Sequence, residues 1–185
     1  MRRGSRRLAR PIRLTRVGRV VYEMVMNPQF PLVVVMRSLA ETLALGRRIG
    51  RAARPGDVVA LIGELGAGKT ALTKGVLAGL GGNPDDVTSP TFVLMLRHDG
   101  GRLPLFHFDA YRLAGGAELV EIGAEEGFYG KGLSVIEWAD RVAGVLPENR
   151  LEMRLRVTGR TEREIALTPL GDRARALAEV LIEDS

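Results

Sequence analysis

The chain contains the stretch Gly63-Glu64-Leu65-Gly66-Ala67-Gly68-Lys69-Thr70, which fits the pattern G-x-x-x-x-G-K-[ST] of a phosphate-binding P-loop. Glycines in such a loop let successive backbone N–H groups turn toward a di- or triphosphate, where side chains would obstruct them. In this pattern Lys69 reaches the β- and γ-phosphates, and the Thr70 hydroxyl is a ligand for Mg²⁺. The stretch therefore predicts a site for a nucleoside polyphosphate with its metal ion.

The residues on both sides of the loop fit the structure that a P-loop needs. The run from Val58 to Ile62 is continuously apolar, as a buried parallel strand is. Residues 71–80 have the composition of a helix, which Gly81-Gly82 ends. A strand, a glycine loop and a helix in this order direct the positive end of the helix dipole at the phosphates.

Further apolar runs predict the rest of the sheet. They occupy residues 32–36, 92–96, 103–108 and 133–136. Ser38 to Glu41 has the pattern of a capping box and should open a helix. The turn Asp99-Gly100-Gly101 joins two runs so closely that they should pair antiparallel. We predict an α/β protein with a P-loop NTPase-like, three-layer fold and a mixed central sheet.

Composition limits the class of protein further. The 185 residues include no cysteine, which excludes disulfides and thiolate metal sites, and the two histidines do not favour a zinc site. No run approaches the roughly 20 apolar residues that a membrane-spanning helix needs. We expect a cytoplasmic protein with no membrane partner.

Positive charge is concentrated at the N-terminus. Residues 1–19 contain eight arginines and no acid, and removing them changes the net charge from +5 to −3. We expect residues 1–28 to form a basic, disordered extension and residues 29–185 to form a single P-loop domain. An Arg-rich arm that binds nucleic acid and a targeting peptide are the alternatives for this extension.

Two acids follow predicted strands directly. Asp109 comes after Phe106-His107-Phe108, and Glu137 comes after Val135-Ile136. The carboxyl ends of strands face the ligand crevice of an open α/β sheet, so both acids should reach the nucleotide. Either one could bind the metal, while the other orients the hydrolytic water.

Other polar and aromatic residues have two interpretations each. In Thr88-Ser89-Pro90-Thr91 the hydroxyls, Thr91 included, either sense the γ-phosphate and metal or simply form a turn. Trp138 either lines the nucleotide site or packs in the core. His107 alternates with apolar residues, so we expect it to be structural.

Together, these motifs resemble those of the TsaE family, also called YjeE. The matching motifs are the P-loop, Ser89-Pro90-Thr91-Phe92, His107-Phe108-Asp109-Ala110-Tyr111-Arg112-Leu113 and Val135-Ile136-Glu137-Trp138. The resemblance extends from about Leu32 to Ile182. It implies a P-loop ATPase that binds ATP and Mg²⁺, hydrolyses ATP weakly and acts with the TsaD and TsaB subunits. That complex threonylcarbamoylates the adenosine next to the anticodon in tRNAs that read codons beginning with A, so tRNA would be an indirect partner.

The resemblance also implies roles for individual residues. The nucleotide phosphates would be bound by Leu65, Gly66, Ala67, Gly68, Lys69 and Thr70. Thr70 and Glu137 would bind Mg²⁺, and Asp109 would be the acid needed for hydrolysis. Ser38 and Gly159 match two further nucleotide-contacting positions of the family.

Two other functions remain as alternatives. A small-molecule kinase of the P-loop class would use Arg102, Arg112 or Arg141 to clamp a phosphate acceptor. However, no lid insertion separates the P-loop helix from Glu137, which favours an ATPase. The other alternative is direct tRNA binding by the arginine-rich tail, with the ATP site as a regulator.

Overall fold

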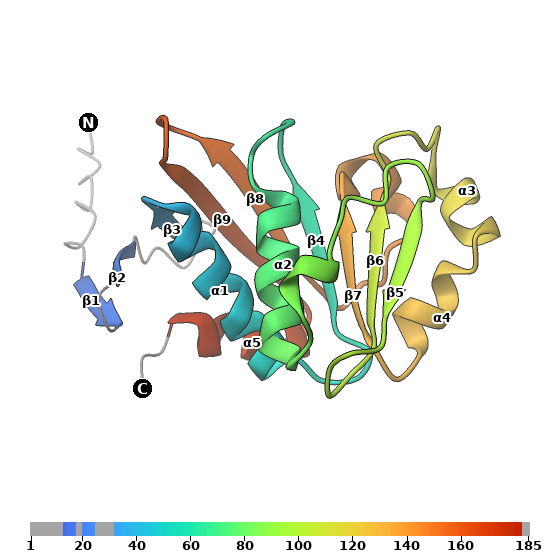
Figure 1. Cartoon of the computed structure of the whole chain (residues 1–185), viewed down its shortest axis with the longest axis horizontal. Coiled ribbons are helices and arrows are strands. Elements are labelled where there is room, and N and C mark those ends of the chain that lie inside the picture. Colours follow the sequence, from blue (N-terminus) through green and yellow to red (C-terminus); the bar gives the residue numbers. More distant parts are fainter. Residues whose placement is uncertain (1–12, 18–19, 25–31, 183–185) are drawn as a thin grey trace, which may run out of the picture.

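The computed structural model describes residues 13–17, 20–24 and 32–182. Figure 1 shows that residues 32–182 form a twisted sheet with helices on both faces. Its strands are β3 (Leu32–Met36), β4 (Val58–Ile62), β5 (Met95–His98), β6 (Leu105–Asp109), β7 (Leu133–Glu137), β8 (Arg150–Val157) and β9 (Arg163–Leu170).

The sheet is mixed, which confirms the prediction. Its strand order is β3-β9-β8-β4-β7-β6-β5. The four strands β8, β4, β7 and β6 are parallel to one another, and the pairs β3–β9, β9–β8 and β6–β5 are antiparallel. The parallel strands β4, β6 and β7 are buried along their whole length, because helices cover both of their faces.

One predicted strand begins later than its apolar residues suggest. The run 92–96 becomes strand β5 only from Met95, because Val93 and Leu94 both donate their backbone N–H groups to the Pro90 carbonyl. Leu94 adopts a left-handed backbone with φ 66° in this turn. Phe92 is consequently 85% exposed rather than part of the sheet.

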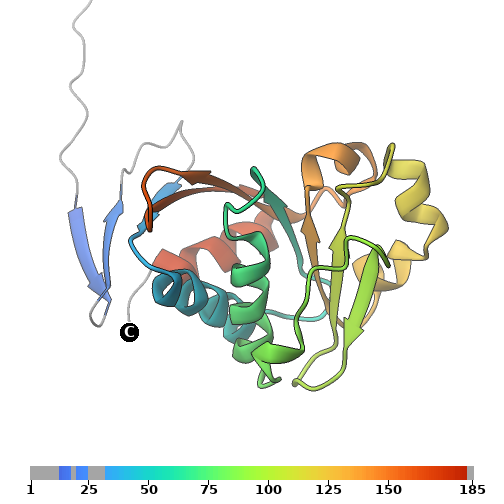
Figure 2. The ribbon, with the colours of Figure 1, turned by 45° about the horizontal axis from the view of Figure 1, so that its top comes forward.

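The helices make two outer layers. One face of the sheet carries α1 (Leu39–Ala52), α2 (Lys69–Leu80) and α5 (Asp172–Ile182), which gather on one side in Figure 2. The other face carries α3 (Gly116–Glu121), α4 (Ala124–Tyr129) and the 3-10 segment η2 (Ala139–Val145). A short 3-10 turn, η1 (Pro84–Asp86), follows α2. No helix in the described part of the chain is long and apolar enough to cross a membrane.

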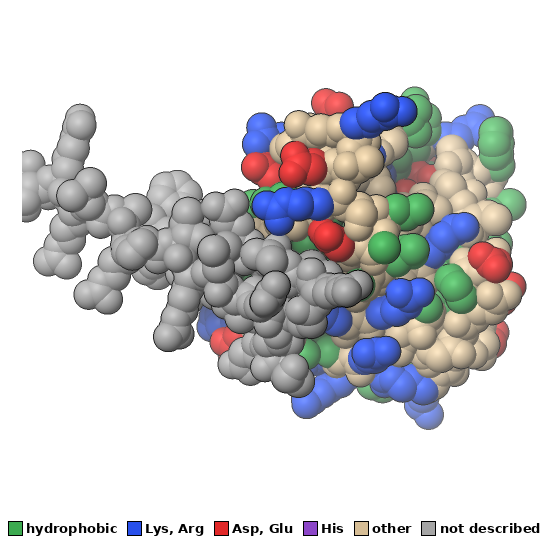
Figure 3. Space-filling view, turned by 60° about the vertical axis from the view of Figure 1, so that its left-hand side comes forward, with side chains coloured by type: hydrophobic (Ala, Val, Ile, Leu, Met, Phe, Trp, Pro, Cys, Tyr) green, Lys and Arg blue, Asp and Glu red, His purple; other side chains and the backbone are tan. Residues whose placement is uncertain are grey.

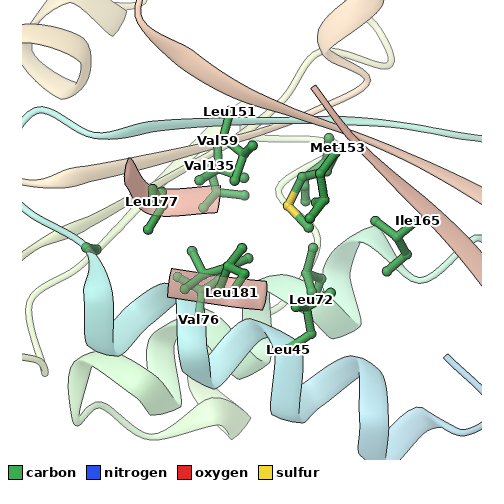
Figure 4. Packing of buried hydrophobic residues seen from close by; sticks show 14 of the residues in the cluster. Leu45, Val59, Leu72, Val76, Val135, Leu151, Met153, Ile165, Leu177 and Leu181 are labelled. Atoms are coloured by element: carbon green, nitrogen blue, oxygen red, sulfur yellow. The ribbon is translucent and has the colours of Figure 1, made fainter. Parts of the chain in front are cut away.

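The larger of two apolar clusters holds α1, α2 and α5 on the sheet. Figure 4 shows side chains of the three helices facing those of β4, β7, β8 and β9. The labelled residues are Leu45, Val59, Leu72, Val76, Val135, Leu151, Met153, Ile165, Leu177 and Leu181. These contacts hold the first turn of α2, where the P-loop ends, at the carboxyl end of β4.

Helices α1 and α2 touch through their backbones. A Cβ atom at Gly46 would lie 2.3 Å from the Leu72 carbonyl oxygen and 2.8 Å from the Cα of Gly75. A Cβ atom at Gly50 would lie 2.8 Å from the Cα of Gly79. Two glycine pairs, each spaced four residues apart, therefore form a seam that no larger residue could enter without moving a helix.

Both ends of α1 are capped. Ser38 accepts a hydrogen bond from the Glu41 backbone N–H (3.2 Å), as the capping-box pattern predicts. The Glu41 carboxylate accepts one from the Arg37 N–H (2.6 Å). At the other end the Arg102 guanidinium donates to the carbonyls of Gly50, Arg51 and Ala53 at 2.6–2.9 Å. Arg102 thereby satisfies carbonyl groups that a helix end leaves unpaired.

Part of the N-terminal extension contains regular structure where disorder is the expectation. Strands β1 (Arg13–Val17) and β2 (Val20–Met24) pair antiparallel, in agreement with their valine and tyrosine content. The rest of the extension, residues 1–12, 18–19 and 25–28, lies outside the described residues, so its expected disorder stays a prediction. In the upper half of the face in Figure 3, acidic side chains lie beside Lys and Arg side chains.

Candidate nucleotide site

The P-loop joins β4 to α2 as predicted. Gly66 and Gly68 have φ angles of 78° and 106°, which L side chains rarely adopt. Gly63 (φ 156°) lies so close to β8 that a Cβ would approach the Leu155 carbonyl oxygen to 2.5 Å. The glycines of the motif are therefore required by the path of the backbone, and α2 begins at Lys69.

A cavity of about 350 Å³ opens above this loop. It brings together residues that lie up to 73 positions apart in the chain, from β4–α2, the loop before β5, and the ends of β6 and β7. The lining residues are Leu65, Gly66, Gly68, Lys69, Thr70, Ala71, Ser89, Thr91, Asp109, Tyr111, Glu137 and Trp138. Most residues that the sequence predicts as site residues thus line one cavity, whereas Ala67 of the same loop is buried in the larger apolar cluster.

A second cavity of about 310 Å³ adjoins the first and shares Gly66, Gly68 and Ala71 with it. It is lined by Ser38 and Thr42 on the α1 side and by Arg160 and Arg163 on the β8–β9 side, together with Leu39 and Thr161. Ser38 therefore does lie beside the P-loop. Gly159 lines neither cavity, but its neighbour Arg160 does.

Glu137 and Thr70 meet at the mouth of the P-loop. The Thr70 hydroxyl lies 2.9 Å from Oε1 and 3.2 Å from Oε2 of Glu137. Both side chains offer hard oxygen ligands, which Mg²⁺ prefers. The described residues contain no group of three or more His, Asp or Glu side chains suited to a metal. A bound Mg²⁺ would thus take its other ligands from phosphate and water, as this ion usually does.

Asp109 is held by three donors. Its Oδ2 accepts hydrogen bonds from the hydroxyls of Ser89 (2.8 Å) and Thr91 (2.6 Å), and its Oδ1 accepts one from the Tyr111 backbone N–H (2.9 Å). The carboxylate is 2% exposed, so these bonds fix its orientation at the end of β6. The Ser89–Thr91 segment, interpreted from sequence as a switch or a turn, thus contacts the candidate catalytic acid directly.

Lys69 and Trp138 close one side of the cavity. Lys69 Nζ donates to the carbonyls of Gly63 (2.7 Å) and Glu64 (2.9 Å) and lies 3.8 Å from the centre of the Trp138 ring. Burial lowers the pKa of Lys69, while the charges of Glu137, Asp109 and Asp140 act in the opposite direction. Trp138 has a left-handed backbone with φ 58°. Its ring lines the cavity and also packs at the edge of the smaller apolar cluster.

His107 occupies a position that its sequence pattern does not predict. It is fully buried, and its Nε2 lies 2.9 Å from Glu137 Oε1. His107, which the sequence predicts to be structural, therefore contacts a candidate metal ligand. The sequence feature that could have indicated a place near the site is its spacing of two residues from Asp109, because residues i and i+2 of a strand share a face.

The arginines that a kinase would need lie elsewhere. Arg102 caps α1, and Arg141 donates to the Leu113 carbonyl at 3.2–3.3 Å. The Arg112 guanidinium lies 5.3 Å from the centre of the Phe92 ring. Lys69 is the one Lys or Arg among the residues that line the P-loop cavity.

The sequence matches a family model and several known proteins. Residues 36–165 match the family model described as threonylcarbamoyl adenosine biosynthesis protein TsaE. Two similar proteins are named tRNA threonylcarbamoyladenosine biosynthesis protein TsaE. That of Bacillus subtilis is 42% identical over 141 residues, covering 76% of this chain and 87% of the relative. That of Treponema pallidum is 46% identical over 133 residues, covering 72% and 97%.

A solved structure shares the fold. The crystal structure of Bacillus subtilis YdiB matches with a TM-score of 0.69 at 37% identity, covering 82% of this chain and 93% of that chain. Since the family model spans most of the chain and the relatives are matched over nearly their whole length, the chain belongs to the TsaE family.

Proposed function

We propose that this protein is a Mg²⁺-dependent ATPase of low intrinsic activity that serves tRNA threonylcarbamoyladenosine biosynthesis. The pathway is the one named for its relatives. The observation that carries the enzymatic part is the contact between the P-loop hydroxyl of Thr70 and the carboxylate of Glu137, with Asp109 in the same cavity. A phosphate loop, a metal-binding pair and a separate acid are the parts that ATP hydrolysis requires.

Different residues of the site bind the phosphates, bind the metal ion and orient the water. Backbone N–H groups of residues 65–70 and the Lys69 ammonium bind the phosphates. Thr70 and Glu137 would hold Mg²⁺, which would supply positive charge to offset that of the phosphates. Asp109 accepts a hydrogen bond from the attacking water and orients it. Ser38 and Arg160 lie where the second cavity extends from the phosphates, so that side accommodates the nucleoside.

We further propose that TsaD and TsaB are the partners and that tRNA is reached through them. The names of the relatives, which place them in tRNA threonylcarbamoyladenosine biosynthesis, support this proposal. Co-purification of the full chain with TsaD and TsaB, with and without ATP, tests the association. Isotope-labelled ATP separates ATPase from kinase, because an ATPase releases all of its labelled phosphate into solution.

Replacing Lys69 with alanine should weaken ATP binding about 10- to 100-fold, because a charge-assisted phosphate contact is lost. Isothermal titration calorimetry measures the affinity. Lys74, on the same helix but outside the cavity, provides the matched control, and Lys74→Ala should bind as the parent does. Equal affinities for the two variants would contradict the assignment of Lys69.

Replacing Glu137 with glutamine should raise the Mg²⁺ concentration needed for hydrolysis by about tenfold or more, since a neutral amide is a weaker ligand for a hard cation. A Mg²⁺ titration of phosphate release at saturating ATP measures this shift. The exposed Glu148 offers the control Glu148→Gln. An unchanged titration curve for Glu137→Gln would remove Glu137 from the metal site.

A further inference from the structure

His107 shares a row of side chains with the acid that follows it on β6. Leu105, His107 and Asp109 alternate with residues of the opposite face, and Leu105 belongs to the larger apolar cluster. On the neighbouring parallel strand β7, His107 is in register with Val135 and Asp109 with Glu137. The fully buried, polar ring of His107 thus lies next to the cavity, two residues before Asp109 on the same strand.

The ring has one polar contact among the described residues. Nε2 lies 2.9 Å from Glu137 Oε1, and Nδ1 has no hydrogen-bond partner. An ionised carboxylate only accepts hydrogen bonds, so Nε2 must carry the proton and donate it. Among the described residues, Glu137 is therefore the one hydrogen-bond partner of His107.

The two carboxylate oxygens of Glu137 differ in the number of their hydrogen-bond contacts. Oε1 lies 2.9 Å from both His107 Nε2 and the Thr70 hydroxyl, whereas Oε2 has only the longer 3.2 Å contact with Thr70. The hydroxyl of Thr70 has a single proton, so it cannot fix both oxygens at once. A second donor at Oε1 is needed to stop the carboxylate from rotating.

We propose that His107 is a positioning residue for the metal site: its Nε2–H group holds Oε1 of Glu137 so that Oε2 remains for Mg²⁺. This role rests on the proposed function, in which Glu137 binds the ion. Groups that orient metal ligands through hydrogen bonds commonly change metal affinity 10- to 100-fold when they are replaced. His107 would act in this way without touching the nucleotide or the metal.

A purely structural role makes a different prediction. A buried imidazole with an unpaired nitrogen gains nothing over an apolar side chain of similar volume. If His107 only filled space beside Leu105 and Val135, leucine would replace it without consequence for Mg²⁺. A structural defect, in contrast, would weaken nucleotide binding whether or not Mg²⁺ is present.

Two amide variants of the full chain test the proposal. Glutamine has an amide nitrogen at a reach close to that of Nε2, whereas the shorter asparagine cannot reach Oε1. Trp138, the single tryptophan of the chain, lines the cavity, so its fluorescence should change when a nucleotide binds. ATP is titrated in EDTA, and Mg²⁺ is then titrated into the complex.

The expected result separates metal from nucleotide. His107→Asn and His107→Leu should raise the Mg²⁺ concentration for half-maximal change about tenfold, with ATP affinity in EDTA within about twofold of the parent. His107→Gln should restore the parental Mg²⁺ requirement to within about threefold. His98→Leu, a change at the neighbouring histidine whose ring centre is 6.3 Å from that of His107, is the matched control and should behave as the parent.

Three outcomes would overturn the proposal. Parental Mg²⁺ titrations for His107→Asn and His107→Leu would show that His107 does not position the ligand. Equal losses of affinity in EDTA and in Mg²⁺ would show a structural defect instead. A parent whose ATP binding ignores Mg²⁺ would overturn the proposed function together with this role, so the two failures are distinguishable.

Discussion

Asp109→Asn should bind ATP with nearly the parental affinity and hydrolyse it about 10²- to 10⁴-fold more slowly. Removal of a group that takes or orients a proton in the transition state has an effect of this size. Binding should survive because the Lys69 contact and the loop N–H groups are untouched. Calorimetry gives the affinity, and phosphate release under single-turnover conditions gives the rate.

The asparagine side chain suits this experiment because of the contacts around Asp109. The hydroxyls of Ser89 and Thr91 can rotate to accept from an amide, and the amide oxygen can still accept from the Tyr111 N–H. The fold around the variant should therefore be kept. Asp99→Asn, at an exposed acid in the β5–β6 turn, is the control and should hydrolyse ATP as the parent does.

An Asp109→Asn protein that hydrolyses ATP at the parental rate would show that another group orients the water. A variant that fails to bind ATP would instead show that Asp109 contributes to the binding site itself. Either result would leave the phosphate-binding role of the loop intact, because Asp109 is not part of it.

Gly46→Ala should destabilise the protein by about 2 kcal/mol or more, although alanine is the better helix former. Alanine gains about 1 kcal/mol in helix propensity over glycine. The added Cβ would lie 2.3 Å from the Leu72 carbonyl oxygen, and backbone cannot yield there without separating α1 from α2. Overpacking costs typically 1–3 kcal/mol and occasionally more, and a clash this close with backbone belongs at the upper end, about 3 kcal/mol or more. Subtracting the gain in helix propensity leaves a net loss of about 2 kcal/mol or more.

Urea unfolding followed by circular dichroism measures this change, and the midpoint of thermal unfolding should fall by about 4–8 °C. Gly144→Ala is the matched control, because a Cβ at this exposed position would meet nothing within 4 Å. It should change stability by no more than about 0.5 kcal/mol. If both variants unfolded alike, close packing at the seam would not limit stability.

Much of the fold follows from local sequence. The apolar run Val58–Ile62, the glycine loop and the helix behind it predict a P-loop unit, because each needs only its own residues to be recognised. The antiparallel pair around Asp99–Gly101 follows in the same way from a turn. Asp109 and Glu137 could be placed together because strand ends in an open α/β sheet converge on one crevice.

Features that depend on contacts between distant segments were not predictable. Gly46 and Gly75 have ordinary roles in separate helices, and only the packed pair shows why neither carries a side chain. The contact between His107 and Glu137 requires the register of β6 against β7, which periodicity does not supply. The strand predicted to begin at residue 92 begins only at Met95, because the Pro90 carbonyl accepts hydrogen bonds from two N–H groups that the sheet would otherwise use.

The backbone of Trp138 sets a limit for anyone who wishes to make this protein more heat-resistant. Its φ of 58° costs an L residue about 1–2 kcal/mol, and glycine would avoid that cost. The same exchange would remove the ring that lies against Lys69 and leave that side of the cavity open. Relief of the backbone strain at Trp138 would therefore remove a side chain that lines the cavity. Substitutions meant to raise thermal stability should begin at positions remote from the nucleotide.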